Sequence, residues 1–422
     1  MRFDLRRSLA AFILCSIAAG ASPAVAAPKL DLLYSFCSTS GCPDGDQPYG
    51  GVTLLSSGEM VGTTGFGGKY GDGTVFSLDR RKGAWQIHSL KSFCVGKPPS
   101  CQPYQGPIVT LVADTSGNLY GSTYFGGKYS NGAVFELEAK GGHKYALHYL
   151  YSFNGTDGYG PWELSYAGQS AGQRYDGTSP LYGTTIAGTG GAGIVFSLTP
   201  NGGQWDFATL YNFCSAGSCS DGGLPRGGVI VDPASGTLYG TTSYYGDNSA
   251  GTIFALANSG GTWNYTLLYT FCSEADCDDG NAPFAGLAED ATGNLYGTTY
   301  FGGAQDDGVV FEFTAGGKLN VLHAFCSEAG CTDGSLPAAA VTLDSAGDVF
   351  GTAGRGGNEN YGTLFRIAGG KFKTMYSFCS LAGCADGGYP YGTLALDASG
   401  NVYGTTQYGG AHALGEVYEL KQ

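Results

Sequence analysis

A segment of the general form Leu-Tyr-Gly-Thr-Thr recurs seven times along the chain, and this repeat limits the possible folds more than any other feature. It returns at intervals of 53 to 62 residues. Its central glycines are Gly62, Gly121, Gly183, Gly240, Gly297, Gly351 and Gly404. Self-similarity of this kind is typical of folds built from stacked or radially arranged supersecondary units. The chain is therefore organised as seven similar units.

Each unit contains four short apolar runs. In the fourth unit, for example, residues 229–231 precede the repeated segment, and runs near 252–254 and 263–271 follow it. The runs are rich in β-branched and aromatic residues and are bounded by Gly, Asn and Asp, which indicates strands rather than helices. We expect four antiparallel strands per unit, joined by tight turns or Gly-rich loops.

The position of one strand identifies the closed architecture. The chain stops at Gln422 directly after its last third strand, so the seventh unit lacks a fourth strand at that end. The run Leu32–Phe36 near the other end supplies it. In a closed ring, the N-terminal strand would complete the last unit and hold the two ends of the chain together, as in propellers. We call this pairing the clasp. A linear array would gain nothing from it. The sequence predicts an all-β, seven-bladed β-propeller as one domain over residues 27–422.

Several linked motifs resemble those of a known family. The run 294–299, followed by Phe301-Gly302-Gly303 and then Val310-Phe311, resembles the unit of the bacterial GloVer tandem-repeat proteins. The turn 397–403 is similar to turns of NHL-type propellers. The resemblance covers essentially the whole chain after the first 26 residues. It implies a propeller and export, and no established activity.

The first 26 residues have the features of a secretory signal peptide. Arg2, Arg6 and Arg7 give a positive start, Leu9–Ala19 forms an apolar core too short to span a bilayer, and Ala24-Val25-Ala26 is a small-x-small cleavage pattern. We expect an extracellular or periplasmic protein.

Composition excludes several classes of function. Gly accounts for 74 of 422 residues, aromatic and charged residues each make up 13%, and the net charge is −14. Such frequent aromatic residues can bury area, so the chain is not disordered. An acidic surface repels phosphate backbones, which argues against a nucleic-acid partner. No segment after the signal is apolar and long enough to cross a membrane. We also expect the protein to be a monomer.

The cysteines predict a set of local disulfides. Apart from Cys15 in the signal, they form six close pairs: Cys37 and Cys42, Cys94 and Cys101, Cys214 and Cys219, Cys272 and Cys277, Cys326 and Cys331, and Cys379 and Cys384. An even number and an export signal favour disulfides. Zinc is the alternative, but it needs four converging ligands and the pairs are spread one per unit.

Other motifs have structural explanations. The stretches 188–193 and 168–172 match a dinucleotide fingerprint and a nucleophile elbow, yet neither precedes an expected helix. An Asp-Gly pair recurs after five of the six cysteine loops and in the corresponding loop of the third unit, at Asp44, Asp157, Asp221, Asp279, Asp333 and Asp386. We interpret these Asp residues as turn caps, with calcium as the alternative. No other cofactor is expected. The five His residues show no metal-ligand spacing, and His323 replaces a Tyr of the other units.

The long loops gather on one face, because successive strands reverse direction. Aromatic residues next to glycines on these loops are the candidate binding residues: Tyr124, Phe125, Tyr244, Tyr245, Tyr300, Phe301 and Tyr408, together with Trp162 of the irregular third unit. The alternative is that these side chains pack between neighbouring blades.

Two functions are compatible with these features. The first is a non-enzymatic exported binding or scaffold protein that recognises glycans or cell-surface proteins through the long-loop face, with no catalytic residues. The second is a polysaccharide lyase or hydrolase, whose site has to break the symmetry of the repeats. The third unit is the candidate for that site: it contains Trp162, Glu163, Tyr166, Arg174 and Tyr175.

The cleavage pattern makes a prediction about the mature protein. Signal peptidase should cut after Ala26, leaving Ala27 or Pro28 at the N-terminus. Intact-mass analysis of the exported protein measures this directly. Exported protein that retains Met1 would contradict it.

Overall fold

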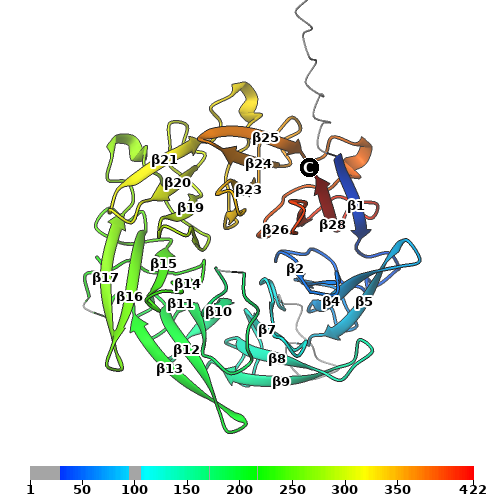
Figure 1. Ribbon diagram of the computed structural model, residues 1–422, viewed down its shortest axis with the longest axis horizontal. Coiled ribbons are helices and arrows are strands. Elements are labelled where there is room, and N and C mark those ends of the chain that lie inside the picture. The colour runs from blue at the N-terminus through cyan, green and yellow to red at the C-terminus, as the bar shows by residue number, and fades with distance from the viewer. Residues whose placement is uncertain (1–28, 95–105, 171, 216) are drawn as a thin grey trace, which may run out of the picture.

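The computed structural model describes residues 29–94, 106–170, 172–215 and 217–422, and these form seven four-stranded sheets arranged around a ring. Figure 1 shows the ring viewed along its axis, with one sheet per blade. Every pair of neighbouring strands within a blade is antiparallel, as expected. The expected signal peptide lies outside the described residues. Within the described part, no helix is long and apolar enough to span a membrane.

The strands of each blade follow one another from the axis outward. The innermost strands are β2 (Thr53–Leu54), β6 (Val112–Ala113), β10 (Tyr159–Ser165), β14 (Val229–Val231), β18 (Ala288–Glu289), β22 (Thr342–Leu343) and β26 (Ala395–Leu396). The second strands carry the repeated segment and are β3 (Met60–Thr64), β7 (Leu119–Thr123), β11 (Leu181–Ala187), β15 (Leu238–Thr242), β19 (Leu295–Thr299), β23 (Val349–Ala353) and β27 (Val402–Thr406).

In six of the seven blades, both outer strands are longer than the two inner ones. The third strands are β4 (Thr74–Arg81), β8 (Ala133–Ala139), β12 (Ile194–Asn201), β16 (Thr252–Ser259), β20 (Val309–Phe313), β24 (Thr363–Ala368) and β28 (Glu416–Lys421). The outermost strands are β5 (Ala84–Ser92), β9 (Tyr145–Ser152), β13 (Gln204–Asn212), β17 (Thr262–Thr270), β21 (Leu319–Ala324), β25 (Lys371–Ser377) and β1 (Lys29–Ser35). Three cysteine loops contain 3₁₀ turns: η1 (Ala275–Cys277), η2 (Ala329–Cys331) and η3 (Ala382–Cys384).

The predicted clasp is confirmed. The last blade has the strand order β26-β27-β28-β1, so its outermost strand comes from the beginning of the chain. β1 pairs with β28 from Lys29 opposite Lys421 to Ser35 opposite Glu416. Figure 1 shows the blue β1 beside the red β28. Closing the ring in this way leaves no blade with three strands.

The central glycine of the repeated segment is required by an aromatic ring. In every blade this glycine faces an aromatic side chain of the third strand, and a Cβ atom on the glycine would come within 2.4 to 2.8 Å of that side chain. At Gly62, for example, the Cβ atom would lie 2.6 Å from the Phe76 ring. Any larger residue would push the ring out of the core. The strongest signal in the sequence therefore marks a close approach of backbone to ring.

The same rings join neighbouring blades. An aromatic residue that follows each outermost strand contacts the third-strand ring of the next blade, with centroids 5.0 to 5.4 Å apart, in seven pairs: Phe36–Phe76, Phe93–Phe135, Phe153–Phe196, Phe213–Phe254, Phe271–Phe311, Phe325–Phe365 and Phe378–Tyr418. All fourteen rings are at most 3% exposed. Tilted and edge-on aromatic contacts of this kind stabilise beyond the area that they bury.

The clasp predicts a contrast between two nearby residues. Phe36 is fully buried, whereas Leu32 on β1 is 41% exposed. Phe36→Ala should lower the free energy of unfolding by about 3–5 kcal/mol, because it leaves a cavity at the closing blade interface. Leu32→Ala is the matched control and should change it by no more than about 0.5 kcal/mol. Denaturant unfolding measures both, and equal effects would contradict the role given to the clasp.

The last blade departs from the repeat at Glu416. Its equivalents in three other blades are Thr74, Thr252 and Thr363. The Glu416 side chain is fully buried, and neither carboxyl oxygen has a hydrogen-bond partner among the described residues. Burial, together with the nearby Asp386 carboxylate, raises the pKa of Glu416 to about 9. The group is therefore neutral in the folded protein at neutral pH.

This buried carboxyl group predicts an unusual pH dependence. Because its folded pKa lies above its unfolded value, the stability it contributes is complete below about pH 4.5 and is lost as the pH rises through about 9. Glu416→Thr should raise the free energy of unfolding at pH 7.5 by about 1–3 kcal/mol and flatten this decline. Unfolding curves at pH 5, 7.5 and 9 test it. Glu138→Thr is the control, because the Glu138 side chain lies near the end of β8 and is 40% exposed, and an equal effect there would contradict the explanation.

Candidate functional site

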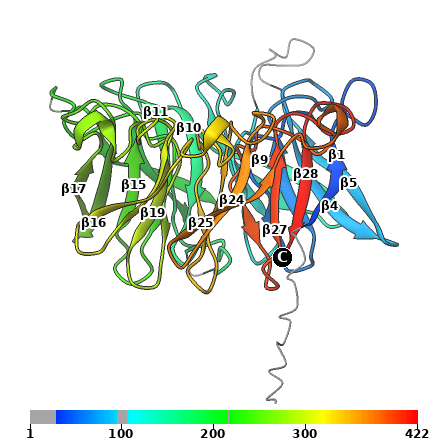
Figure 2. The ribbon, with the colours of Figure 1, turned by 90° about the horizontal axis from the view of Figure 1, so that it is seen from above.

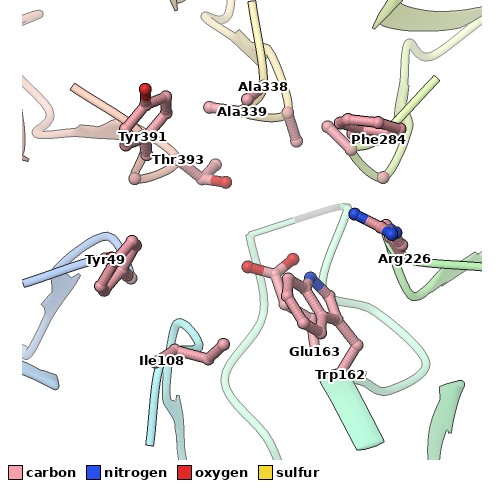
Figure 3. A pocket seen from close by; sticks show the side chains of 16 residues that line it. Tyr49, Ile108, Trp162, Glu163, Arg226, Phe284, Ala338, Ala339, Tyr391 and Thr393 are labelled. Atoms are coloured by element: carbon pink, nitrogen blue, oxygen red, sulfur yellow. The ribbon is translucent and has the colours of Figure 1, made fainter. Parts of the chain in front are cut away.

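One residue of each blade points toward the axis near the start of the innermost strand: six lie just before that strand, and Trp162 lies within β10. These seven residues are Tyr49, Ile108, Trp162, Arg226, Phe284, Ala338 and Tyr391, and they line a cavity of about 290 Å³ at the centre of the ring. Figure 3 shows their side chains converging from all around the axis. We call these residues the axial ring. Six of them follow the cysteine loops and Trp162 follows the equivalent loop of the third blade, so the cavity lies at the long-loop end of the axis, which is the upper face in Figure 2.

Threonines of the repeated segment hold the axial ring in place. Thr63 Oγ1 donates to the carbonyl of Val109 in the next blade at 2.9 Å, and Thr241 Oγ1 donates to that of Ala285 at 2.9 Å. Thr405 Oγ1 donates to the Gly50 carbonyl at 2.9 Å, which carries the pattern across the clasp. Each acceptor is the residue directly after an axial-ring residue. The repeat thus fixes the backbone, while the side chain at the axis is free to vary.

The cavity wall combines aromatic surface with one carboxyl group and one guanidinium. Glu163 follows Trp162 and is the only carboxyl group among the lining residues of the described chain. Its carboxyl accepts a hydrogen bond from Thr110 Oγ1 at 3.2 Å, and burial raises its pKa. The Arg226 guanidinium lies 4.8 Å above the Phe284 ring, and its buried Nε has no hydrogen-bond partner among the described residues.

Neither of these two groups has an opposite charge beside it. No ion pair within the described residues involves Glu163 or Arg226. Buried polar groups are normally satisfied, and those that are not call for an explanation. Figure 3 shows the Glu163 carboxyl and the Arg226 guanidinium on the cavity wall, on either side of the Trp162 ring. A donor and an acceptor thus remain available to a third molecule.

The aromatic residues predicted from the sequence lie at different distances from this cavity. Trp162 lines it. Tyr124 contacts the Trp162 ring, with centroids 5.9 Å apart, and Tyr300 stacks on Phe284 at 4.8 Å. Tyr244 lies farther out, 6.2 Å from the Phe284 ring centroid.

The remaining predicted residues form an outer rim. Phe125 and Phe301 contact the neighbouring Tyr124 and Tyr300 rings. Tyr245 and Tyr408 are 42% and 38% exposed. The two alternatives considered for these side chains therefore apply to different members. Tyr124 and Tyr300 pack against the axial ring and Phe125 and Phe301 are half-buried, whereas Tyr244, Tyr245 and Tyr408 are exposed.

The residues of the irregular third blade do not form one site. Trp162 and Glu163 face the axial cavity, but Tyr166 and Tyr175 belong to the blade core, and each donates its hydroxyl proton to a backbone carbonyl at 2.6 Å. Arg174 donates to the Leu54 carbonyl at 3.4 Å. Glu163 and Arg174, which are close in the sequence, therefore lie at different cavities.

The insertion in this blade lies at the other end of the axis. Gln169, Ser170 and Gly172 contribute to two further cavities, whose walls include the innermost strands of the first, second and fourth to seventh blades. No helix follows this stretch in the described chain, so it lacks the context of a nucleophile elbow. The glycine-rich stretch 188–193 likewise connects two strands, β11 and β12.

The loops that surround the cavity are stiffened in two ways. Five of the predicted disulfides are present: Cys37–Cys42, Cys214–Cys219, Cys272–Cys277, Cys326–Cys331 and Cys379–Cys384. Cys101, the expected partner of Cys94, and Cys15 lie outside the described residues.

Aspartates also cap these loops. In six blades, a tyrosine hydroxyl or histidine imidazole of the outermost strand is hydrogen-bonded to the loop carboxylate at 2.6 to 3.0 Å. The pairs are Tyr34–Asp44, Tyr151–Asp157, Tyr211–Asp221, Tyr269–Asp279, His323–Asp333 and Tyr376–Asp386. Backbone N–H groups add further bonds, as to Asp386 from Ser380 and Leu381. His323, which the sequence places at the position of a tyrosine, thus makes the same hydrogen bond as that tyrosine, and burial lowers the pKa of its imidazole.

Sequence reasoning missed most of the axial ring. Tyr49, Arg226, Phe284 and Tyr391 were not singled out, because their column varies from blade to blade. The signal was present in the spacing: Tyr49, Ile108, Phe284, Ala338 and Tyr391 each lie 13 residues before the central glycine of the repeat. The distance from the glycine is constant at this position but the side chain varies. The fold therefore sets where the residue lies without needing its side chain for the core.

Solved structures of known proteins show a distant likeness to this chain. A putative oxidoreductase (glucose dehydrogenase) of Thermus thermophilus is 15% identical over 74% of this chain and 95% of its own, with a TM-score of 0.42. The α-L-arabinanase of Penicillium chrysogenum is 14% identical (74% and 91%, TM-score 0.43), and the Aleuria aurantia lectin is 10% identical (78% and 96%, TM-score 0.42). Likeness at this level does not extend to ligand or chemistry.

The sequence itself matches one family. The profile of the Gloeobacter/Verrucomicrobia repeat matches residues 99–288 and 276–422. Among curated proteins, no sequence matches.

Proposed function

This chain belongs to the Gloeobacter/Verrucomicrobia repeat family, and we propose that it is an exported binding protein that takes a glycan unit in the axial cavity. The observation that supports this most is the pair of Glu163 and Arg226, an acceptor and a donor without ion-pair partners among the described residues, inside an aromatic wall. Sugars present apolar faces that stack on aromatic rings and hydroxyl groups that bond to carboxyl and guanidinium groups.

The size of the cavity fits a small ligand. Its volume of about 290 Å³ is at the lower limit of ordinary ligand sites. It therefore suits one sugar residue, either free or at the end of a longer chain that continues over the outer rim. The five disulfides support the export that this role requires, since such bonds persist in oxidising compartments.

The lining residues favour binding over glycoside hydrolysis. The raised pKa of Glu163 would suit a general acid. The common mechanisms of glycosidases also need a second carboxyl group about 5 to 9.5 Å away. Glu163 is the only carboxyl group among the lining residues of the described chain. An acid without its partner can hold a sugar hydroxyl but does not complete that mechanism.

The proposal predicts which variants lose binding. A glycan array with the mature protein identifies the ligand, and calorimetry then measures its affinity for the variants. Trp162→Ala should lower affinity about fivefold to tenfold through the lost stacking contact. Arg226→Gln should lower it about tenfold or more, because it removes a charge-assisted hydrogen bond. Tyr129→Ala is the control: this tyrosine is 48% exposed and does not line the cavity.

Three outcomes are informative. Loss of affinity at Trp162 and Arg226, with unchanged melting, supports the axial site. Loss at Tyr245 and Tyr408 only would move the binding surface to the outer rim and overturn the proposal. Glycan cleavage that disappears in Glu163→Gln would overturn it in favour of an enzyme.

A further inference from the structure

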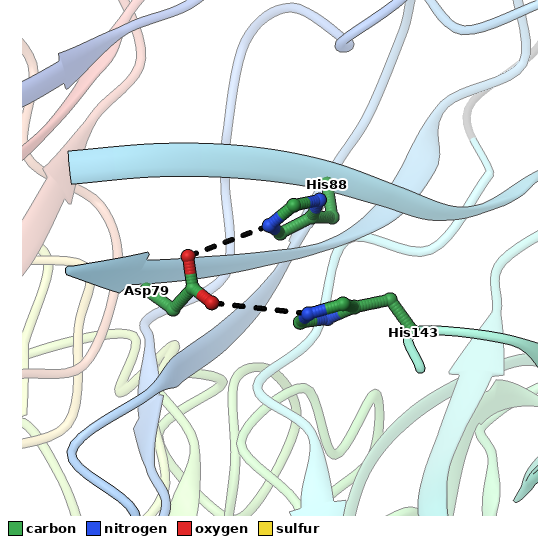
Figure 4. A group of neighbouring side chains, drawn as sticks. All are labelled: Asp79, His88 and His143. Atoms are coloured by element: carbon green, nitrogen blue, oxygen red, sulfur yellow. Dashed lines mark hydrogen bonds and ion pairs between the residues drawn. The ribbon is translucent and has the colours of Figure 1, made fainter. Parts of the chain in front are cut away.

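The first two blades bring together two histidines that lie far apart in the sequence. Asp79 lies on β4 and His88 on β5 of the first blade, and His143 lies in the β8–β9 turn of the second. Figure 4 shows both imidazole rings directed at the Asp79 carboxylate. His88 Nε2 is 3.4 Å from Asp79 Oδ1, and His143 Nε2 is 3.8 Å from Oδ2. One ligand atom from each residue lies within 4.8 Å of the others.

Hydrogen bonds define which nitrogen of His143 is available. Arg81 Nη2 lies 2.7 Å from His143 Nε2, and a guanidinium can only donate, so Nε2 carries the lone pair. The proton is then on Nδ1, which lies 3.3 Å from both Glu59 Oε1 and Ser77 Oγ. A carboxylate next to the protonated Nδ1, with the lone pair on Nε2, is the arrangement of metal-ligating histidines, because the carboxylate orients the ring and favours ligation through Nε2.

The guanidinium of Arg81 occupies the place of a cation. It bonds Asp79 Oδ2 at 2.8 Å as well as His143 Nε2, so it contacts two of the three candidate ligands. The Arg81 side chain is 51% exposed and is free to turn into the solvent. The separations of 3.4 and 3.8 Å are close to the ~3.3 Å between neighbouring ligands of tetrahedral zinc with bonds of 2.0–2.1 Å.

We propose that Asp79, His88 and His143 form a site for a divalent transition-metal cation, with zinc as the best match, that joins the first blade to the second. Two imidazoles and one carboxylate are the donors that zinc prefers, and they leave a fourth position for water. The two rings stack at 4.0 Å with an angle of 16°, so one of them has to turn out of the stack when the metal binds. His143 can do so, because it lies at a turn.

The site is distinct from the axial cavity. The β2–β3 and β8–β9 turns that contribute Glu59 and His143 lie on the short-turn face, opposite the cysteine loops. None of the three ligands lines the axial cavity. Metal binding and glycan binding can therefore be measured separately.

Titration with zinc chloride tests the proposal. The mature protein, prepared without a histidine tag and treated with a chelator, should bind one zinc ion at pH 7.5 and melt at a higher temperature in its presence. His88→Ala and His143→Ala should each abolish this binding, and Glu59→Gln should weaken it about tenfold as an outer partner. Arg81→Gln should strengthen it severalfold, because it removes the competing cation.

The control is a second His–carboxylate pair. His148 Nε2 lies 3.0 Å from Glu138 Oε2 in the second blade, and His148→Ala should leave zinc affinity unchanged. Cobalt should give the visible absorption of a tetrahedral site in the wild type and lose it in His143→Ala. Absence of zinc binding, equal binding by all variants, or weaker binding by Arg81→Gln would each overturn the proposal. Melting in chelator confirms that the variants are folded.

Discussion

The contact on which the whole ring depends is the buried aromatic pair between neighbouring blades. Each pair joins a ring after one outermost strand to a third-strand ring of the next blade, at a nearly constant 5.0 to 5.4 Å. The repeated glycine makes the pair possible, because only a residue without Cβ leaves room for the third-strand ring. A constant contact between blades imposes a constant angle, and seven such angles close the circle.

This uniform scaffold explains why the candidate sites lie where the repeat changes. Threonine hydroxyls fix the backbone beside the axial ring, so its side chains can differ without loss of stability. Arg226 and Glu163 are such departures at the axis, and His143 is one at a turn. Glu416 is a departure inside the clasp, where a carboxyl group without hydrogen-bond partners among the described residues makes closure of the last blade sensitive to pH.

Much of the fold was predictable from local chemistry. Period, strand-forming runs and turn residues indicated four strands in each of seven units, and the displaced strand at residues 32–36 indicated closure. The nearest-neighbour cysteine pairs were predictable because a separation of only five positions in the sequence keeps the two thiols together. The binding residues were only partly predictable: Trp162 was identified, whereas Arg226 and Tyr391 were not, since their column shows no common residue type.

The sequence by itself determined the unit, the number of units and the way the ring closes, because these follow from contacts between residues close in the chain or repeated at one period. Only the tertiary structure decided which side chains meet across units. Residues as distant as Tyr49 and Tyr391 come to share a cavity, and His88 and His143 come to share one carboxylate. The repeat pattern of the sequence does not predict these contacts between units. Each contact depends on the angle between blades, and the buried aromatic pairs set that angle.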